Sequence, residues 1–284
     1  MIIDGIKHSQ SVYNTLKQEI ITHNYSPKLS AILVGDSPAS LHYISQKQKW
    51  ADYIGMDFEL IQLPEATTQE ELLEQMQALN TDTKVSGYIV QLPLPKHINS
   101  DAILKALAPE KDVDGFHPVN QWKTVIGDIN GFVPCTPAGI MELFTLEEIA
   151  LSGKVVCVLG RSNIVWKPII NLLTNAGATV MACNSKTLNI SSFTKQADII
   201  ILAIWQPQFL KADMISNSAI VIDVGFSLVD GTIFWDADTH NIEKNGNLIT
   251  PVPGWVWRMT VALLLKNTLK AHKIAKSINE HIKS

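Results

Sequence analysis

Short apolar runs alternate with longer amphipathic stretches along this chain, and no other feature constrains its fold as strongly. The runs expected to form strands are residues 29–34, 58–63, 85–92, 154–159, 178–183, 198–203 and 219–224. The stretches between them predict helices over residues 40–53, 68–79, 99–107 and 165–176, and a long helix from residue 261 onward. Strands that alternate with helices at this spacing indicate βαβ units and parallel sheets, so the predicted fold class is α/β.

Residues 109–137 interrupt the alternation, because they contain several Pro and Gly residues and little periodicity. A chain of 284 residues has the length of roughly two domains. We therefore expect two α/β domains flanking a cleft, with this segment as the crossing between them. Further along, residues 228–234 predict a hairpin around Asp230-Gly231, and residues 251–258 predict a loop rich in Pro, Gly and Trp.

Composition excludes several classes of protein. Hydrophobic residues make up 46% of the chain and charged residues 18%, which is typical of a packed globular protein. The net charge of −4 provides no basic surplus for nucleic acid, and no apolar run approaches the ~20 residues of a membrane span. We expect neither partner. The three cysteines lack CxxC spacing, so neither a disulfide framework nor a zinc site is expected, and no signal peptide is visible. These features favour a cytoplasmic enzyme.

The second half opens with a strand that runs through GRSNIVW into a helix. A glycine turn at a helix N-terminus is where a dinucleotide pyrophosphate binds, because free backbone N–H groups face it. Gly160 stands without the full GxGxxG pattern, so an ordinary strand-to-helix turn is an equal alternative.

The following strand ends in Cys183-Asn184-Ser185-Lys186 and carries no acid. An acid at that place would bind the ribose 2′-hydroxyl of NAD. Arg161, Ser162 and Ser185, together with Lys186, could instead hold a 2′-phosphate. The alternative is a polar loop with a solvated lysine.

Three candidates for chemistry lie in the first half. Tyr43 and Lys47 are four residues apart and share one helix face, where a desolvated lysine can act as an acid or base; the alternative is an exposed lysine. Gln91 ends a predicted parallel strand, where α/β sheets place ligands. Asp112 and Asp114 could ligate a metal, although no His or Glu at supporting spacing favours one.

Several motifs together resemble one family, the bifunctional methylenetetrahydrofolate dehydrogenase/methenyltetrahydrofolate cyclohydrolases. They occur in order as VGDSPAS, the Tyr43/Lys47 pair, QLPLP, KDVDGF, PCTP, GRSNIV and TPVPG, and the match runs nearly end to end. The resemblance implies a folate-binding catalytic domain of residues 1–118 and 260–284, in which the tail helix packs back, and a Rossmann-like NADP-binding domain of residues 119–259. It also implies a homodimer.

The activity implied is oxidation of 5,10-methylenetetrahydrofolate with NADP, followed by hydrolysis of the methenyl product to 10-formyltetrahydrofolate. By motif match, Lys47 would be the catalytic lysine of hydrolysis, Gln91 would tune its protonation, and Tyr43 would stack on the folate. The folate site implied further contains Ser40, Asp114, Pro253 and Gly254. The NADP site implied contains Gly160, Arg161, Ser162, Asn163, Ile164 and Ser185. No metal is implied.

Six tryptophans stand where the resemblance implies glycine. They are Trp122, Trp166, Trp205, Trp235, Trp255 and Trp257, and Asn184 and Arg258 also depart from the pattern. Glycine is used at such places for unusual φ/ψ and close approach to a ligand. Drift would give assorted residues rather than one rare type, so our hypothesis is that these tryptophans are glycines read with the wrong genetic code.

Two alternatives remain. One is a non-catalytic folate- or nucleotide-binding paralogue, in which Trp166, Trp255 and Trp257 fill the cofactor cleft. If the chain is made as written, Trp255 and Trp257 would also crowd the cleft and strain the backbone of the closing loop. The other is a Rossmann oxidoreductase that resembles the shikimate dehydrogenases in layout, but it leaves the Tyr43/Lys47 pair, QLPLP and KDVDGF unexplained.

Overall fold

The structure, a computed structural model, describes residues 3–229, 232–250 and 255–283. The chain forms two compact units. Unit 1 comprises Met1–His8, Thr124–Asp128 and Thr136–Thr260, and unit 2 comprises Ser9–Lys123, Ile129–Cys135 and Val261–Ser284. Within the described ranges, no helix combines the length and apolarity needed to cross a membrane.

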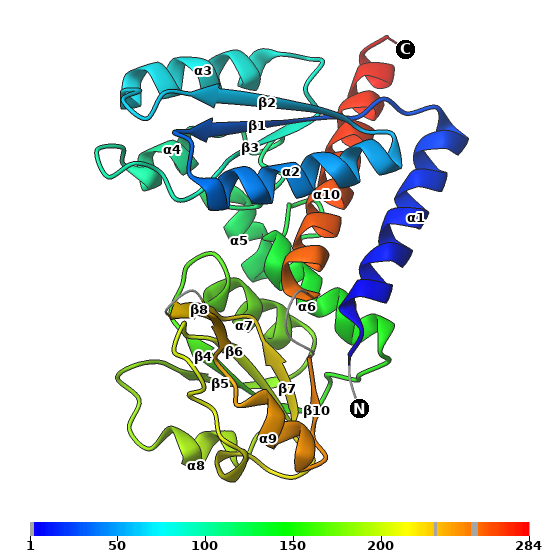
Figure 1. Ribbon diagram of the computed structural model, residues 1–284. Coiled ribbons are helices and arrows are strands. Elements are labelled where there is room, and N and C mark those ends of the chain that lie inside the picture. The colour runs from blue at the N-terminus through cyan, green and yellow to red at the C-terminus, as the bar shows by residue number, and fades with distance from the viewer. Residues whose placement is uncertain (1–2, 230–231, 251–254, 284) are drawn as a thin grey trace. The chain divides into compact units, whose positions relative to one another are not determined.

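Unit 2 contains a three-stranded parallel sheet in the order β2-β1-β3. Its strands are β1 (Lys28–Val34), β2 (Asp57–Leu63) and β3 (Gly87–Val90), and its helices, some extending past the unit boundary, are α1 (Gly5–His23), α2 (Pro38–Ile54), α3 (Gln69–Thr81), α4 (Ser100–Ala106), α5 (Pro118–Ile126) and α10 (Trp255–Lys283). Figure 1 shows α2 and α3 on opposite sides of this sheet. Both faces are therefore covered, as all-parallel sheets require.

Local sequence explains where these helices begin. Thr68 caps α3 in a capping box, in which its hydroxyl oxygen accepts from Glu71 N at 3.2 Å and its own N–H donates to the Glu71 carboxylate at 2.8 Å. The apolar face of α3, including Leu72 and Met76, then packs on β1 and β3. The pairing of β3 with β1 continues one residue past the end of β3, because the Gln91 N–H donates to Ile32 O.

Unit 1 contains a five-stranded parallel sheet in the order β10-β7-β6-β4-β5. The strands are β4 (Val155–Gly160), β5 (Thr179–Cys183), β6 (Ile199–Ala203), β7 (Ile220–Asp223) and β10 (Leu248–Ile249), and the helices are α6 (Cys135–Leu146), α7 (Trp166–Asn175), α8 (Ile190–Thr194), the 3-10 helix η1 (Ala212–Met214) and α9 (Thr239–Lys244). Every residue of β6 is buried, as expected for a strand covered on both faces.

An antiparallel hairpin of β8 (Phe226–Val229) and β9 (Thr232–Trp235) adjoins the end of β7. It confirms the hairpin predicted over residues 228–234, while the turn at Asp230-Gly231 lies outside the described residues. The α/β class and the two parallel sheets are likewise confirmed.

Two sequence expectations are wrong. Residues 109–137 are not merely a crossing, because α5 and the start of α6 lie there; Pro118 begins α5, at a position where a missing N–H costs nothing. Residues 255–258 are not loop but the first turn of α10. Residues 5–23, for which no element was predicted, form α1.

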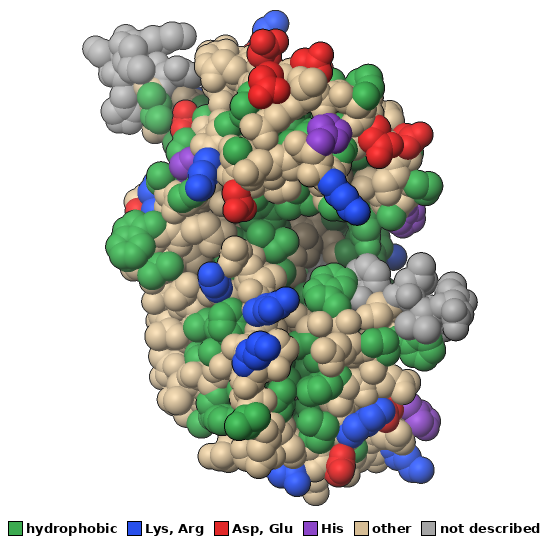
Figure 2. All heavy atoms as spheres, turned by 90° about the vertical axis from the view of Figure 1, so that its left-hand side faces the viewer, with side chains coloured by type: hydrophobic (Ala, Val, Ile, Leu, Met, Phe, Trp, Pro, Cys, Tyr) green, Lys and Arg blue, Asp and Glu red, His purple; other side chains and the backbone are tan. Residues whose placement is uncertain are grey.

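Charge is dispersed on the face shown in Figure 2, where blue Lys and Arg side chains stand singly among tan and green ones. Red Asp and Glu side chains gather near the top of this view. The small negative net charge of the chain agrees with this distribution.

Candidate functional sites in the two units

Lys47 and Gln91 meet in unit 2. Lys47 lies on α2, one turn after Tyr43, and Gln91 directly follows β3. The Lys47 ammonium donates to Gln91 Oε1 at 2.8 Å, and Gln91 Nε2 donates to Leu92 O at 2.7 Å. The second bond fixes the amide so that its oxygen faces the lysine, which leaves the lysine as the donor.

Burial and a neighbouring carboxylate set the charges at this site. Burial lowers the pKa of Lys47 from its ordinary value, and the nearby Asp114 carboxylate opposes that shift. Burial raises the pKa of Asp114, and Lys47 opposes that shift in turn. Burial thus disfavours the charged forms of Lys47 and Asp114, while each charge stabilises the other. A lysine with a lowered pKa in such an environment can take part in proton transfer.

Cys135 also belongs to this site, and sequence reasoning assigned it no role. Its thiol donates to Val113 O at 3.4 Å, and burial together with the nearby Asp114 carboxylate raises the pKa of Cys135 well above its ordinary value. The thiol therefore stays protonated beside Asp114. The PCTP motif was the signal that could have drawn attention to it.

The loop that carries Asp114 is held rigidly. The Asp112 carboxylate accepts from the N–H groups of Phe116 and His117 at 3.1 and 2.8 Å, and from Asn120 Nδ2 at 2.8 Å. Gly115 has φ +74, and a Cβ there would lie 2.6 Å from Phe132 O. Asp112 thus acts as a loop anchor rather than a metal ligand, and within the described ranges no group of three or more His, Cys, Asp or Glu residues is arranged to hold a metal ion.

For the other folate-site candidates, position and burial are the available observations. Tyr43 is half-buried on the Lys47 face of α2, and Ser40 is 4% exposed near the start of the same helix. Pro253 and Gly254 lie outside the described residues. The structure therefore brings together Lys47, Gln91 and Asp114.

A second site lies in unit 1, in a cavity of about 700 Å³. It opens where β4, β5 and β6 end, at the carboxyl edge of the parallel sheet, where α/β folds bind ligands. Gly160 forms its floor: a Cβ there would lie 2.7 Å from Ala203 O, so only glycine lets β4 and β6 approach this closely at the turn.

The predicted cofactor residues line this cavity, apart from Ile164. Arg161, Ser162 and Asn163 come from the turn after β4, and Asn184 and Ser185 from the end of β5. Ser162 Oγ accepts from Val165 N at 3.1 Å and Trp166 N at 3.2 Å, so its O–H can donate to a ligand at the start of α7. Ile164 and Lys186 are not among the lining residues.

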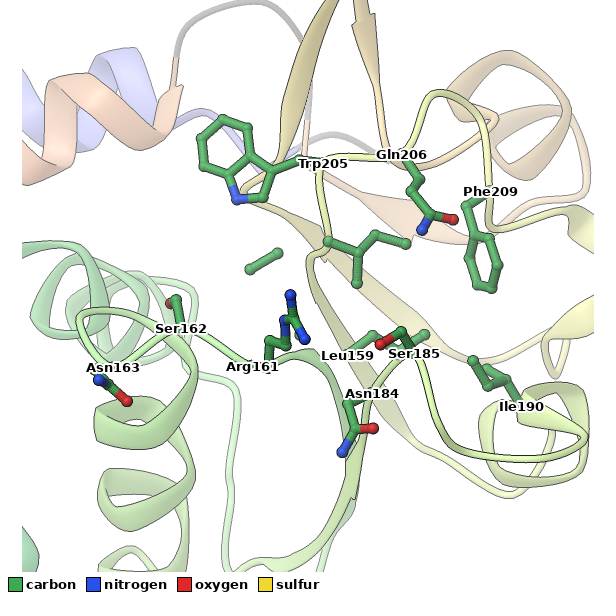
Figure 3. Close-up of a pocket in the computed structure, with 13 residues that line it drawn as sticks. Leu159, Arg161, Ser162, Asn163, Asn184, Ser185, Ile190, Trp205, Gln206 and Phe209 are labelled. Atoms are coloured by element: carbon green, nitrogen blue, oxygen red, sulfur yellow. The ribbon is translucent and has the colours of Figure 1, made fainter. Parts of the chain in front are cut away.

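Charge in the cavity suits an anion. Arg161 is the one charged side chain among the described lining residues, and none of them is acidic. In Figure 3, Arg161 and Ser185 lie on the side of the cavity opposite Trp205. This fits a dinucleotide that carries a 2′-phosphate, since an acid would repel that phosphate.

Sequence reasoning missed the wall formed after β6. Residues 203–206 line the cavity with Ile190 and Phe209, and Figure 3 draws Gln206 and Phe209 on this side. The available signal was the position alone, because residues 203–206 stand at the carboxyl end of a predicted parallel strand.

The tryptophans differ in their surroundings. The Trp166 indole donates to Val158 O at 3.2 Å and is not a lining residue, but it lies against the glycine turn, where a Cβ on Gly160 would be 3.0 Å from Trp166 Cδ1. That Trp166 obstructs the dinucleotide stays a prediction. Trp255 and Trp257 lie in the first turn of α10, so the strained backbone expected there is wrong. Trp205 has φ +61, in the left-handed region that favours glycine, and its side chain is half-exposed at the cavity. Among the described tryptophans it alone has the backbone that the misread-glycine hypothesis requires.

Comparisons with known proteins cover nearly the whole chain. Residues 3–114 match the model for the tetrahydrofolate dehydrogenase/cyclohydrolase catalytic domain, and residues 134–276 match the model for the NAD(P)-binding domain of the same family. The bifunctional protein FolD of Exiguobacterium sibiricum is 46% identical over 96% of this chain and 99% of its own length.

Two solved structures are similar throughout. The FolD methylenetetrahydrofolate dehydrogenase/cyclohydrolase of Campylobacter jejuni has a TM-score of 0.93 and 43% identity, over 96% of this chain and 98% of its own. The methylenetetrahydrofolate dehydrogenase-cyclohydrolase of Trypanosoma brucei, solved in complex with NADP cofactor and an inhibitor, has a TM-score of 0.90 and 34% identity, over 98% of both chains.

Proposed function

Because the chain belongs to the tetrahydrofolate dehydrogenase/cyclohydrolase family, we propose which of its residues serve each of two reactions. The chain is a bifunctional enzyme that oxidises 5,10-methylenetetrahydrofolate to 5,10-methenyltetrahydrofolate with NADP and hydrolyses the methenyl product to 10-formyltetrahydrofolate. The hydrolytic site is the Lys47 site of unit 2, and NADP binds in the cavity of unit 1. The observation that carries this assignment is the 2.8 Å bond from Lys47 to Gln91 in a half-buried position beside Asp114.

Hydrolysis requires water to add to the methenyl carbon and the bond from that carbon to N5 to break. One water hydrogen ends on N5 and the other is released. Neutral Lys47 takes a proton from the attacking water and returns one to N5, and the lowered pKa of Lys47 makes its neutral form accessible. Gln91 accepts one Nζ–H, which directs the nitrogen lone pair toward the substrate.

Folate is positioned by the neighbours of Lys47. Tyr43 stacks on the ring system from the same face of α2, and Asp114 accepts a hydrogen bond from the pterin, beside the protonated thiol of Cys135. Ser40, Pro253 and Gly254 complete the proposed folate site, the last two from outside the described residues.

NADP fits the residues of the unit 1 cavity. Gly160 permits close approach at the turn, Ser162 presents its O–H at the start of α7, and Arg161 and Ser185 hold the 2′-phosphate; Asn163 and Ile164 belong to the same loop. When bound, NADP supplies the acceptor for the hydride. The chain's contribution to the oxidation is to bind and orient both molecules.

The organisation of the chain follows from this division. We assign folate binding to residues 1–118 and 260–284 and NADP binding to residues 119–259. The compact units support this, although residues 1–8 and 260 belong to unit 1 and residues 119–123 and 129–135 to unit 2. We also propose that the chain acts as a homodimer in the cytoplasm.

The proposal is tested by assaying both reactions on the full chain. With 5,10-methylenetetrahydrofolate and NADP, NADPH should form, and separately supplied 5,10-methenyltetrahydrofolate should be hydrolysed. The hydrolysis rate should rise with pH through a midpoint below 10.5, the ordinary pKa of lysine, because Lys47 must be neutral to act. Binding of both ligands without turnover would instead support a non-catalytic paralogue.

A further inference from the structure

Asp236 lies directly behind the cavity wall of unit 1. It follows β9, is fully buried, and accepts from three consecutive backbone N–H groups. Ile204 N and Trp205 N donate to its Oδ2 at 2.7 and 3.0 Å, and Gln206 N donates to its Oδ1 at 2.8 Å. All three donors belong to residues that line the cavity, whereas Asp236 does not line it.

The carboxylate is itself fixed from the other side. A Cβ on Gly225 would overlap the Asp236 carboxylate, so glycine is required to make room for it. Asp223 holds the surrounding backbone, because its two oxygens accept from Gly225 N at 3.1 Å and Ala237 N at 2.7 Å. Asp236 is thus a rigid link between the β7–β9 region and the wall of the cavity.

The wall needs such a link because of Trp205. Its φ of +61 is sterically disfavoured for a residue with a Cβ, and a segment containing it would relax to another conformation without restraint. The three bonds to Asp236 span Trp205 and both its neighbours, so they restrain this backbone directly.

We propose that Asp236 is a positioning residue for the dehydrogenase reaction, which locks residues 204–206 as one wall of the NADP cavity without contacting NADP. The inference rests on the proposed function, since it takes NADP as the occupant of this cavity. An Asp that served only to stabilise unit 1 would affect folding but would not act selectively on the binding of NADP.

Asp236→Asn in the full chain tests this. The substitution keeps the shape but places an amide NH₂ against backbone donors, so at least one of the three bonds is lost. The KM for NADP should rise about tenfold or more, the size expected for loss of a hydrogen bond to a charged group. The kcat at saturating NADP and the rate of methenyl hydrolysis should stay within about threefold of the values for the unsubstituted chain.

Asp198→Asn is the matched control. Asp198 accepts from Val155 N at the opposite end of β6, so its substitution should leave the KM for NADP unchanged.

A double variant separates positioning from mere stabilisation. Glycine adopts φ > 0 freely, so Trp205→Gly should make the wall less dependent on Asp236. The rise in KM caused by Asp236→Asn should therefore be smaller in the Trp205→Gly background. A KM change below about twofold, an equal loss of both activities, or an undiminished effect in the double variant would overturn the proposal.

Gly225→Ala provides a second route if Asp236→Asn does not fold, because the added methyl displaces the carboxylate while all its partners remain. It should raise the KM for NADP in the same selective way, and an unchanged KM would overturn the proposal. Failure of the proposed function is a distinct result: the unsubstituted chain would then form no NADPH.

Discussion

The ammonium nitrogen of Lys47 lies 2.8 Å from the amide oxygen of Gln91, although the residues are 44 positions apart in the chain. One comes from a helix and the other from the end of a strand, and the parallel sheet of unit 2 brings them together. The pair places a lysine with a lowered pKa in a fixed orientation, which is the requirement for a proton-transfer group.

Lys47→Met should abolish methenyl hydrolysis while the chain remains folded. The thioether side chain keeps the volume and loses the proton-transfer group, which is worth ~10²–10⁴ in rate. Lys49→Met is the control, because Lys49 is exposed on another face of α2. A hydrolysis assay that detects a loss of only a few-fold would remove Lys47 from the mechanism.

NADP should be preferred over NAD, and Arg161→Ala should erode that preference. Arg161 is the charged group available to a 2′-phosphate, so its loss should lower kcat/KM for NADP by about tenfold or more and leave NAD little affected. Lys186→Ala, exposed outside the lining, should leave the ratio unchanged. Steady-state kinetics with each cofactor measure this preference. Equal kcat/KM values for NADP and NAD in the unsubstituted chain would contradict the phosphate-binding role.

Folding stability should fall as pH rises from about 4 to about 8 because of Asp223. Burial raises the pKa of Asp223 to about 8 from an ordinary value of 3.8, so the folded chain binds more protons than the unfolded chain throughout this window. Urea unfolding at several pH values measures the slope. Asp223→Asn should make it shallower, and an unchanged slope would show that Asp223 ionises normally.

Trp205→Gly should raise the free energy of unfolding by about 1 kcal/mol, because it relieves a left-handed backbone that costs about 1–3 kcal/mol for a residue with a Cβ. Trp122→Gly is the matched control with the opposite sign: Trp122 is exposed within α5, where glycine costs about 1 kcal/mol. Chemical denaturation of both variants gives the comparison. Destabilisation by both would mean that the Trp205 indole packs more favourably than its backbone is strained.

The misread-glycine hypothesis predicts that the natively produced protein carries glycine at the six positions. Intact-protein mass of material from its own source decides this directly, and in-frame TGA codons would support it. Tryptophan masses would disprove it. The helical backbone at Trp122, Trp166 and Trp257 accommodates either residue, so it does not discriminate.

Local patterns were enough to predict much of the fold. Apolar runs predicted β1, β4, β6 and β7, because a strand buried on both faces must be apolar throughout. Spacing placed Tyr43 and Lys47 on one helix face, and the glycine turn after β4 predicted residues that line the unit 1 cavity. These features depend on residues close together in the chain, so the sequence determines them by itself.

Tertiary structure decided how side chains meet across elements. That Gln91 turns its oxygen to Lys47, that the Cys135 thiol donates to Val113 O, and that Asp236 accepts from the backbone of residues 204–206 all depend on segments distant in sequence. The Trp166 indole donates its N–H to Val158 O, which no pattern around Trp166 predicts. Periodicity reports which face of an element is buried, whereas the partner of a buried polar group depends on how the elements pack.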